Sequence, residues 1–169
     1  MEGINDMFIQ ALDSAEFINA AIDFVSGAEK SIFISTFKAE ISSKVKGEKL
    51  MQFFQILAAK KAEGIDVRML FDTPESGKHI PPSNAKALKF LQKNNIKCKS
   101  LRNGRLCHAK MLIVDNANSI VGSHNLSVMS WGWNFELSVS IPNNKYCQNL
   151  ADIFERVWEK GLYTTYKNK

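Results

Sequence analysis

Residues 108–125 read HAKMLIVDNANSIVGSHN, and this stretch decides the fold that we expect. Two largely apolar runs, residues 106–115 and 119–123, flank the turn residues 116–118, a pattern that predicts a β-hairpin. His108 and Lys110 are two residues apart on the first predicted strand, so both side chains point to one face. The second strand ends at Ser123, and Asn125 follows it. The hairpin therefore brings an imidazole, an ammonium group and small polar side chains to neighbouring strand ends.

This combination of side chains suits phosphoryl transfer. The reaction needs a group that attacks phosphorus, and it needs donors aimed at the charge on the non-bridging oxygens. His108 can supply the first, and Lys110, Ser123 and Asn125 can supply the second.

Around the hairpin, hydrophobic periodicity and turn residues predict alternating strands and helices. Asp13 and Glu16 form a capping-box pattern that starts a helix, and Gly27 ends it. Further helices are expected at about 49–63, 84–94 and 145–160, and further strands at 8–10, 31–37, 65–71, 96–101 and 135–141. This order predicts an α/β fold in one domain spanning residues 1–169, with a mixed, largely parallel sheet and helices on both faces.

Composition excludes several classes of protein. The chain has 169 residues, 45% of them hydrophobic, which is enough for a buried core. No apolar run of about 18 residues is present, so we expect no integral membrane contact. The first 17 residues carry no lysine or arginine, unlike a leader peptide. The three cysteines lack C-x-x-C spacing, which disfavours disulfides and zinc sites, so a cytoplasmic location is expected.

Positive charge is concentrated in one part of the chain. The net charge is +5, and residues 76–114 contain nine lysines and arginines but no acidic residue. Such a window beside the hairpin indicates polyanion binding, although a run of lysines can also be a solvated face. The candidate substrate-binding residues are Lys86, Lys89, Lys93, Arg102 and Arg105.

The hairpin carries a family signature. It matches H-x-K-x4-D-x6-G-S-x-N at His108, Lys110, Asp115, Gly122, Ser123 and Asn125. On this motif the chain is identified as a member of the phospholipase D superfamily. Over residues 7–160 the order of elements resembles that of the small bacterial endonucleases with a single motif. Residues 38–48 depart from them, because this loop looks longer than the family's usual one.

The resemblance implies a mechanism. His108 would attack phosphorus and form a phosphohistidine, while a second histidine protonates the leaving oxygen and later activates water. Lys110 and Asn125 would bind the phosphate oxygens, and Ser123 would donate a hydrogen bond within the site. Asp115 would mainly order the hairpin, and Glu136 would orient the histidine. Neither a metal ion nor another cofactor is implied.

One chain supplies only one histidine of this kind, because His79 and His124 have no lysine two residues further on. A twofold homodimer would place two copies of His108 near its axis. His124 itself is expected to have a structural role. Trp131 and Trp133 could stack on bases, but we expect both to pack in the core.

Three functions remain open at this point. The first is a nuclease that cleaves DNA or RNA with little sequence preference, because lysine contacts to the backbone do not read bases. The second is a phosphodiesterase acting on a phospholipid of the cardiolipin type, since a basic surface also suits anionic membranes. The third is a nucleic-acid-binding module without catalytic activity.

Overall fold

The computed structural model describes residues 9–42, 47–72, 81–101, 105–142 and 144–163, without the side chains of 162 and 163. The helices are α1 (Ser14–Ser26), α2 (Glu48–Ala62), α3 (Ser83–Lys93), α4 (Val128–Gly132) and α5 (Tyr146–Lys160). The strands are β1 (Gln10–Leu12), β2 (Ser31–Ser35), β3 (Asp66–Leu70), β4 (Lys97–Ser100), β5 (Lys110–Val114), β6 (Asn118–Gly122), β7 (Ser138–Ile141) and β8 (Leu162–Tyr163).

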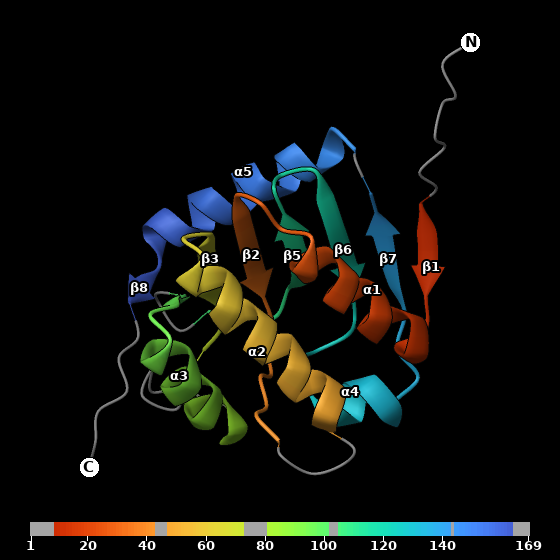
Figure 1. Ribbon diagram of the computed structural model, residues 1–169, viewed down its shortest axis with the longest axis horizontal. Coiled ribbons are helices and arrows are strands. Elements are labelled where there is room, and N and C mark those ends of the chain that lie inside the picture. Colours follow the sequence, from red (N-terminus) through yellow and green to blue (C-terminus); the bar gives the residue numbers. More distant parts are fainter. Residues whose placement is uncertain (1–8, 43–46, 73–80, 102–104, 143, 164–169) are drawn as a thin grey trace.

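The strands form one sheet in the order β1-β7-β6-β5-β2-β3-β4-β8 (Figure 1). The mixed sheet is confirmed, but the expectation that it is largely parallel is wrong. Among the described strands, only the β2–β3 and β3–β4 pairs are parallel, and these are the pairs joined through α2 and α3. The other pairs are antiparallel, because β5 and β6 form a hairpin and β7 runs back along β6.

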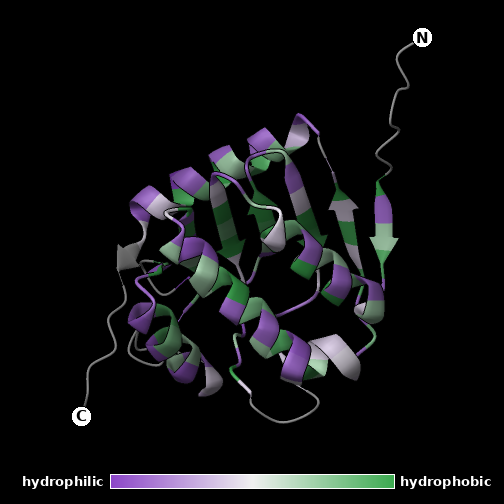
Figure 2. Cartoon of the chain, viewed as in Figure 1, coloured by the Kyte–Doolittle hydropathy of each residue, from purple (hydrophilic) through white to green (hydrophobic). Residues whose placement is uncertain are grey.

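Helices cover both faces of the sheet, as the sequence predicts. The larger core joins α1, α2, α3 and α4 to one face, and α1 and α2 lie across that face in Figure 1. The smaller core lies on the other face, where α5 packs Ala151, Phe154 and Trp158 against Phe33, Leu70 and Ile113 of the central strands. Hydrophobic segments accordingly concentrate in the strands, while the helices alternate between hydrophobic and hydrophilic residues (Figure 2).

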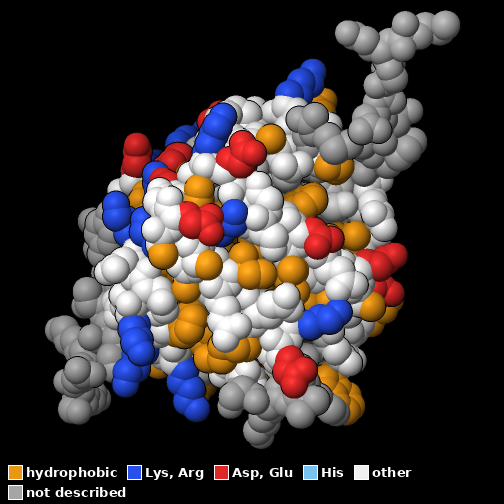
Figure 3. Space-filling view, viewed as in Figure 1, with side chains coloured by type: hydrophobic (Ala, Val, Ile, Leu, Met, Phe, Trp, Pro, Cys, Tyr) orange, Lys and Arg blue, Asp and Glu red, His pale blue; other side chains and the backbone are white. Residues whose placement is uncertain are grey.

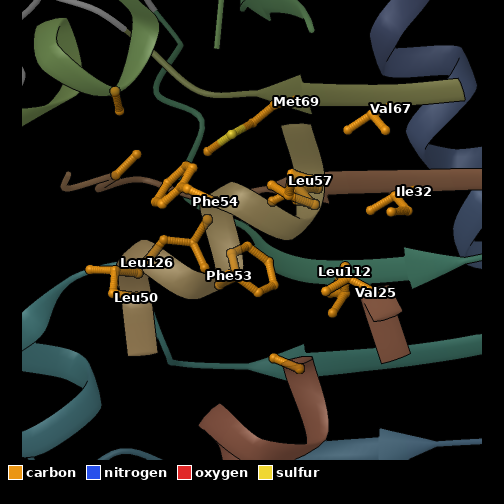
Figure 4. Packing of buried hydrophobic residues seen from close by; sticks show 14 of the residues in the cluster. Val25, Ile32, Leu50, Phe53, Phe54, Leu57, Val67, Met69, Leu112 and Leu126 are labelled. Atoms are coloured by element: carbon orange, nitrogen blue, oxygen red, sulfur yellow. The ribbon is translucent and has the colours of Figure 1, made fainter. Parts of the chain in front are cut away.

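The centre of the larger core is the packing of α2 on the sheet (Figure 4). Phe53, Phe54 and Leu57 of α2 are almost fully buried, next to Ile32 and Met69 of the central strands. Burial of each such side chain contributes about 1.5–3 kcal/mol. This layer holds β2 and β3 in place, and their ends lie beside the residues of the motif.

Most expected elements are confirmed within one to three residues, including the capping box of Asp13 and Glu16. The first strand is Gln10–Leu12 rather than 8–10, and residue 8 lies outside the described residues. The expected strands 106–115 and 135–141 shorten to β5 and β7. Before β5, the Cys107 N–H donates to the side chain of Asp72 instead of to a neighbouring strand.

The turn of the hairpin is tied to the loop before β2 through Asp115. Its carboxylate accepts the N–H groups of Glu29, Lys30 and Ser31 at 2.9, 2.8 and 2.8 Å. Asp115 itself has a φ of 55°, a conformation that Asp and Asn adopt more readily than most residues. No helix in the described part of the chain is long and apolar enough to cross a membrane.

We predict that Asp115→Asn lowers the free energy of unfolding by about 1–2 kcal/mol, because one of the two carboxylate oxygens is replaced by a donor that faces backbone N–H groups. Asn keeps the shape of the side chain and tolerates the positive φ. The measurement is urea unfolding followed by circular dichroism. The control is Asp152→Asn on exposed α5, which should change stability by less than about 0.5 kcal/mol. Equal effects of the two changes would contradict the prediction.

Candidate active site

An open groove of about 650 Å³ lies where β5 begins and β6 ends. Five of the expected site residues line it, together with apolar side chains of β5, β6 and α5. These five are His108, Lys110, Ser123, Asn125 and Glu136. Asp115 lies at the other end of β5, outside the lining of this groove. The structure thus brings together the imidazole, the ammonium group, the hydroxyl, the amide and the carboxylate that the sequence singles out.

His108 and Lys110 are in direct contact. The Lys110 Nζ lies 2.8 Å from His108 Nδ1 and donates to the His108 carbonyl oxygen at 2.6 Å. His108 precedes β5 and is exposed, while the ring of Phe37 lies beside it with 5.0 Å between ring centroids. Burial lowers the pKa of Lys110, an effect that Cys107 and Glu136 partly offset. Phe37 was not among the expected site residues, although it ends the predicted strand 31–37.

The orientation of Asn125 is fixed by the loop after β2. Its Oδ1 accepts from the N–H groups of Phe37 and Lys38 at 3.2 and 3.0 Å, and from Thr36 Oγ1 at 3.2 Å. These contacts occupy the amide oxygen. The amide nitrogen is then the part of Asn125 that can donate to a ligand in the groove.

Glu136 belongs to a network of hydrogen bonds with Ser123. The Ser123 hydroxyl donates to Glu136 Oε2, while Ser130 Oγ and Asn134 Nδ2 donate to Oε1 at 2.9 and 3.1 Å. Burial acts to raise the pKa of Glu136, but these hydrogen bonds outweigh it, so the pKa lies below its usual value. The carboxylate therefore stays ionised near neutral pH. Its hydrogen bonds within the described residues go to this network and not to His108.

The glycine of the motif has a packing role. A Cβ atom built on Gly122 would overlap Ser138 Cα and Leu137 O of the neighbouring strand. Only glycine lets β7 come this close to β6. The close approach places Glu136, which directly precedes this part of the chain, next to Ser123.

His124 lies behind the groove in the core. It is 3% exposed, its Nδ1 lies 2.7 Å from Ser138 Oγ, its Nε2 lies 3.3 Å from Ser14 Oγ, and its ring stacks on Phe17. Burial lowers the pKa of His124, although Glu136 and Asp13 act in the opposite direction. A buried, hydrogen-bonded and stacked ring agrees with the expected structural role.

The candidate substrate-binding residues do not line the groove. Lys86, Lys89 and Lys93 are exposed on α3, and positively charged side chains are visible over α3 in Figure 3, on the side that α1 and α2 cover. Arg105 is exposed three residues before His108, and Arg102 lies outside the described residues.

Two other residues differ from the sequence-based expectations. Lys99, in the basic window, is buried and donates to the Trp158 carbonyl at 2.7 Å, so its charge does not contribute to an exposed basic surface. Trp131 packs in the core as expected, but Trp133 is 62% exposed, which contradicts the expectation for that residue. Within the described residues, no group of three or more His, Cys, Asp or Glu side chains could hold a metal ion.

The buried His124 predicts a pH dependence of stability. Its folded pKa lies below that of the unfolded chain, so unfolding takes up a proton once the pH falls below about 6.5. Stability from this source is complete above that pH and is lost as the pH falls towards the folded pKa. We expect His124→Asn to flatten the decline in unfolding free energy between about pH 7 and about pH 5.5. Urea unfolding of both proteins at each pH measures the unfolding free energy. Curves of this free energy against pH that run parallel for wild type and variant would refute the prediction.

Comparisons with known proteins agree with the fold and with the superfamily that the sequence suggests. The family profile described as cardiolipin synthase, PLD-like domain, matches residues 21–158. Phospholipase D Z of Dictyostelium discoideum is 24% identical over 155 residues, and the match spans 36% of its length.

Two solved structures share the fold. Nuc of Salmonella typhimurium, a phospholipase D family member, superimposes with a TM-score of 0.77 at 21% identity, over 93% of this chain and 97% of Nuc. NucT of Helicobacter pylori gives a TM-score of 0.74 at 15% identity, over 93% of this chain and 99% of NucT. At these identities the likeness concerns the fold alone. Because the family profile covers most of the sequence, the chain belongs to the PLD-like domain family of the phospholipase D superfamily.

Proposed function

We propose that the chain is a metal-independent phosphodiesterase that hydrolyses nucleic acid, with His108 as its nucleophile. The observation that carries this proposal is that His108, Lys110, Asn125 and the Ser123–Glu136 pair line the same groove. The groove offers an attacking group together with a cation and neutral donors for phosphate oxygens. A site of this composition suits a phosphodiester, whose negative charge remains through the reaction.

The contact between Lys110 and His108 bears on the first step. An ammonium group can only donate, so the Lys110 contact makes His108 Nδ1 an acceptor and leaves the proton of the neutral ring on Nε2. A phosphate that draws Lys110 onto its oxygens would free Nδ1 to take that proton. The Nε2 lone pair would then be available for attack. Substrate binding and activation of the nucleophile are coupled in this way.

In the reaction itself, His108 Nε2 forms a bond to phosphorus, and the bond from phosphorus to the leaving oxygen breaks. A second imidazole gives that oxygen its proton. Water then attacks phosphorus, passes a proton to the second imidazole and displaces His108. Apart from His108, the histidine in the described part of the chain is His124, and its burial in the core supports a second copy of the chain as the source of the second imidazole.

The near-complete overlap with Nuc and NucT supports placing the chain with the small members of the superfamily that carry one motif. The open shape of the groove suits a long polymer. Residues 81–110 contain lysines and arginines but no acidic residue. We therefore favour DNA or RNA as the substrate. The chain spans about a third of phospholipase D Z, so the activity of that longer protein is not carried over.

A second candidate substrate is a phospholipid of the cardiolipin type. Met111, Val121, Leu150 and Ile153 give the groove an apolar side that suits acyl chains. The description of the family profile also points in this direction. A module that binds nucleic acid without cleaving it is the least favoured reading, because the residues needed for turnover line one groove.

We predict that His108→Ala loses all detectable hydrolysis, because no other described residue that lines the groove has an imidazole to replace the nucleophile. Wild type and variant are assayed with EDTA on single-stranded DNA, duplex DNA, RNA and cardiolipin vesicles. Nucleic-acid cleavage in EDTA that disappears in the variant supports the proposal. Cleavage of the vesicles alone would assign the lipid substrate instead. Full activity of His108→Ala, or a strict need for a divalent ion, would overturn the mechanism.

The surface beside the groove supports a homodimer with His108 near its twofold axis. Val121 and Val139 are cross-strand partners, so they share one sheet face with Met111, and α5 packs mainly on the central strands of that face. Next to them Leu137 is 54% exposed and Phe135 is 96% exposed. An apolar patch of this kind marks an interaction surface. A second copy seated here would bring the partner's His108 towards the groove.

We predict a non-linear loss of activity when inactive His108→Ala is mixed and re-equilibrated with wild type. A site that needs two copies of His108 works only in wild-type pairs, so activity should follow the square of the wild-type fraction. A linear dilution would mean that each chain works alone. Light scattering should show a dimer that Leu137→Glu dissociates. The matched control is Tyr146→Glu, which changes an exposed aromatic residue at the start of α5 and should leave the dimer intact.

A further inference from the structure

We propose that Asp72 is the positioning residue that holds the backbone of His108 in place for attack, an inference that rests on the proposed function. Asp72 is the second residue after the end of β3 and is 0% exposed. Its carboxylate accepts the Cys107 N–H at 2.7 Å through Oδ2 and the Leu101 N–H at 3.3 Å through Oδ1. Cys107 is the residue immediately before His108.

The segment that carries His108 needs such support. After β4, the chain must pass the ends of β3 and β2 to reach β5, because β5 lies on the far side of both strands in the sheet. Residues 105–109 have no regular secondary structure. Their backbone positions therefore depend on contacts with side chains and with the ends of the strands that they cross.

The segment is held from both sides of His108. On the side before it, Asp72 accepts the Cys107 N–H, and the Cys107 Sγ lies 3.4 Å from the Leu70 carbonyl oxygen. On the side after it, Ser35 Oγ donates to the Ala109 carbonyl at 3.0 Å. The ends of β3 and β2 thus each hold one neighbour of His108. The imidazole projects from a backbone that is fixed before and after it.

The backbone of Asp72 also takes part in the contacts that fix Phe37, whose ring lies beside the imidazole of His108. Asn84 is fully buried and donates through Nδ2 to the carbonyl oxygens of Asp72 and Phe37, at 2.6 and 2.9 Å. The Phe37 ring lies beside His108. Asp72, just after β3, therefore connects the segment that carries His108 with the loop that carries Phe37.

A carboxylate suits this role better than an amide. Both of its oxygens accept, so it can receive N–H groups from two sides, whereas an amide turns one of them into a donor. A misplaced nucleophile slows the reaction far more than it weakens binding, because attack depends on geometry at the level of about 1 Å. Loss of the Asp72 carboxylate should consequently appear in kcat rather than in KM.

The test compares Asp72→Asn with wild type in the full chain, on whichever of the DNA, RNA and vesicle substrates wild type cleaves. We expect kcat to fall roughly 10- to 100-fold while KM stays close to wild type. Hydrogen exchange at the Cys107 amide should become faster. In imidazole NMR spectra the His108 signals should shift, while those of buried His124 serve as the internal reference.

The control for general loss of stability is Val25→Ala, a fully buried residue in the last turn of α1. It should lower stability while leaving kcat and the His108 signals unchanged. Should Asp72→Asn fail to fold, amide hydrogen exchange of the wild type is the second measurement: a protected Cys107 amide supports the contact with Asp72, and an amide that exchanges as fast as in an unfolded peptide would overturn it.

The outcomes separate this inference from the proposed function. A kcat equal to that of Val25→Ala, or unmoved His108 signals, would overturn the role of Asp72. If wild type cleaves none of the substrates, the proposed function fails, and the exchange and imidazole measurements decide the positioning role by themselves. Shifted His108 signals then support it, and unchanged signals reject it.

Discussion

The register of three neighbouring strands determines where the polar groups of the groove lie. Lys110 pairs with Gly122, and Gly122 pairs with Ser138, so the strands β5, β6 and β7 reach the same edge of the sheet in one row. The groove residues come from this row and from the segments just beyond it. A slip of one residue in either pair would move every side chain of the slipped strand to the opposite face, and the polar groups would no longer meet in one groove. The absence of a side chain at Gly122 allows the close contact on which this register depends.

The sequence predicts this part of the molecule well because the information is local. Two apolar runs around a turn define the hairpin, and the spacing of the polar residues places them at its open end. The capping box of Asp13 and Glu16 is local in the same sense. The family signature adds specificity, because it fixes which polar residues belong together.

Features that depend on distant contacts could not be predicted in this way. The irregular path before β5 depends on Asp72, whose carboxylate takes the Cys107 N–H from 35 positions away in sequence. From its place in the basic window Lys99 would be expected on the surface, but in β4 its side chain is directed inwards and donates to the Trp158 carbonyl oxygen. The apolar face of α3 packs on the side of the sheet that α2 covers, and this packing determines where the exposed lysines of the helix lie. Their proximity to His108 in sequence does not reveal that position. The share of parallel strands likewise depends on how the strands are ordered across the sheet.

The opposite ends of β5 serve different purposes. His108 and Lys110 lie at its start, and the carboxylate of Asp115 binds the α1–β2 loop just after its end, roughly 17 Å away for a strand of five residues. Sites separated by this distance contribute almost independently to the free energy of the protein. The loop from Glu29 to Ser31 and the hairpin turn therefore form a region where thermal robustness can be engineered without disturbing the groove. A protein built in this way can gain or lose stability during its evolution while the geometry around the imidazole is preserved.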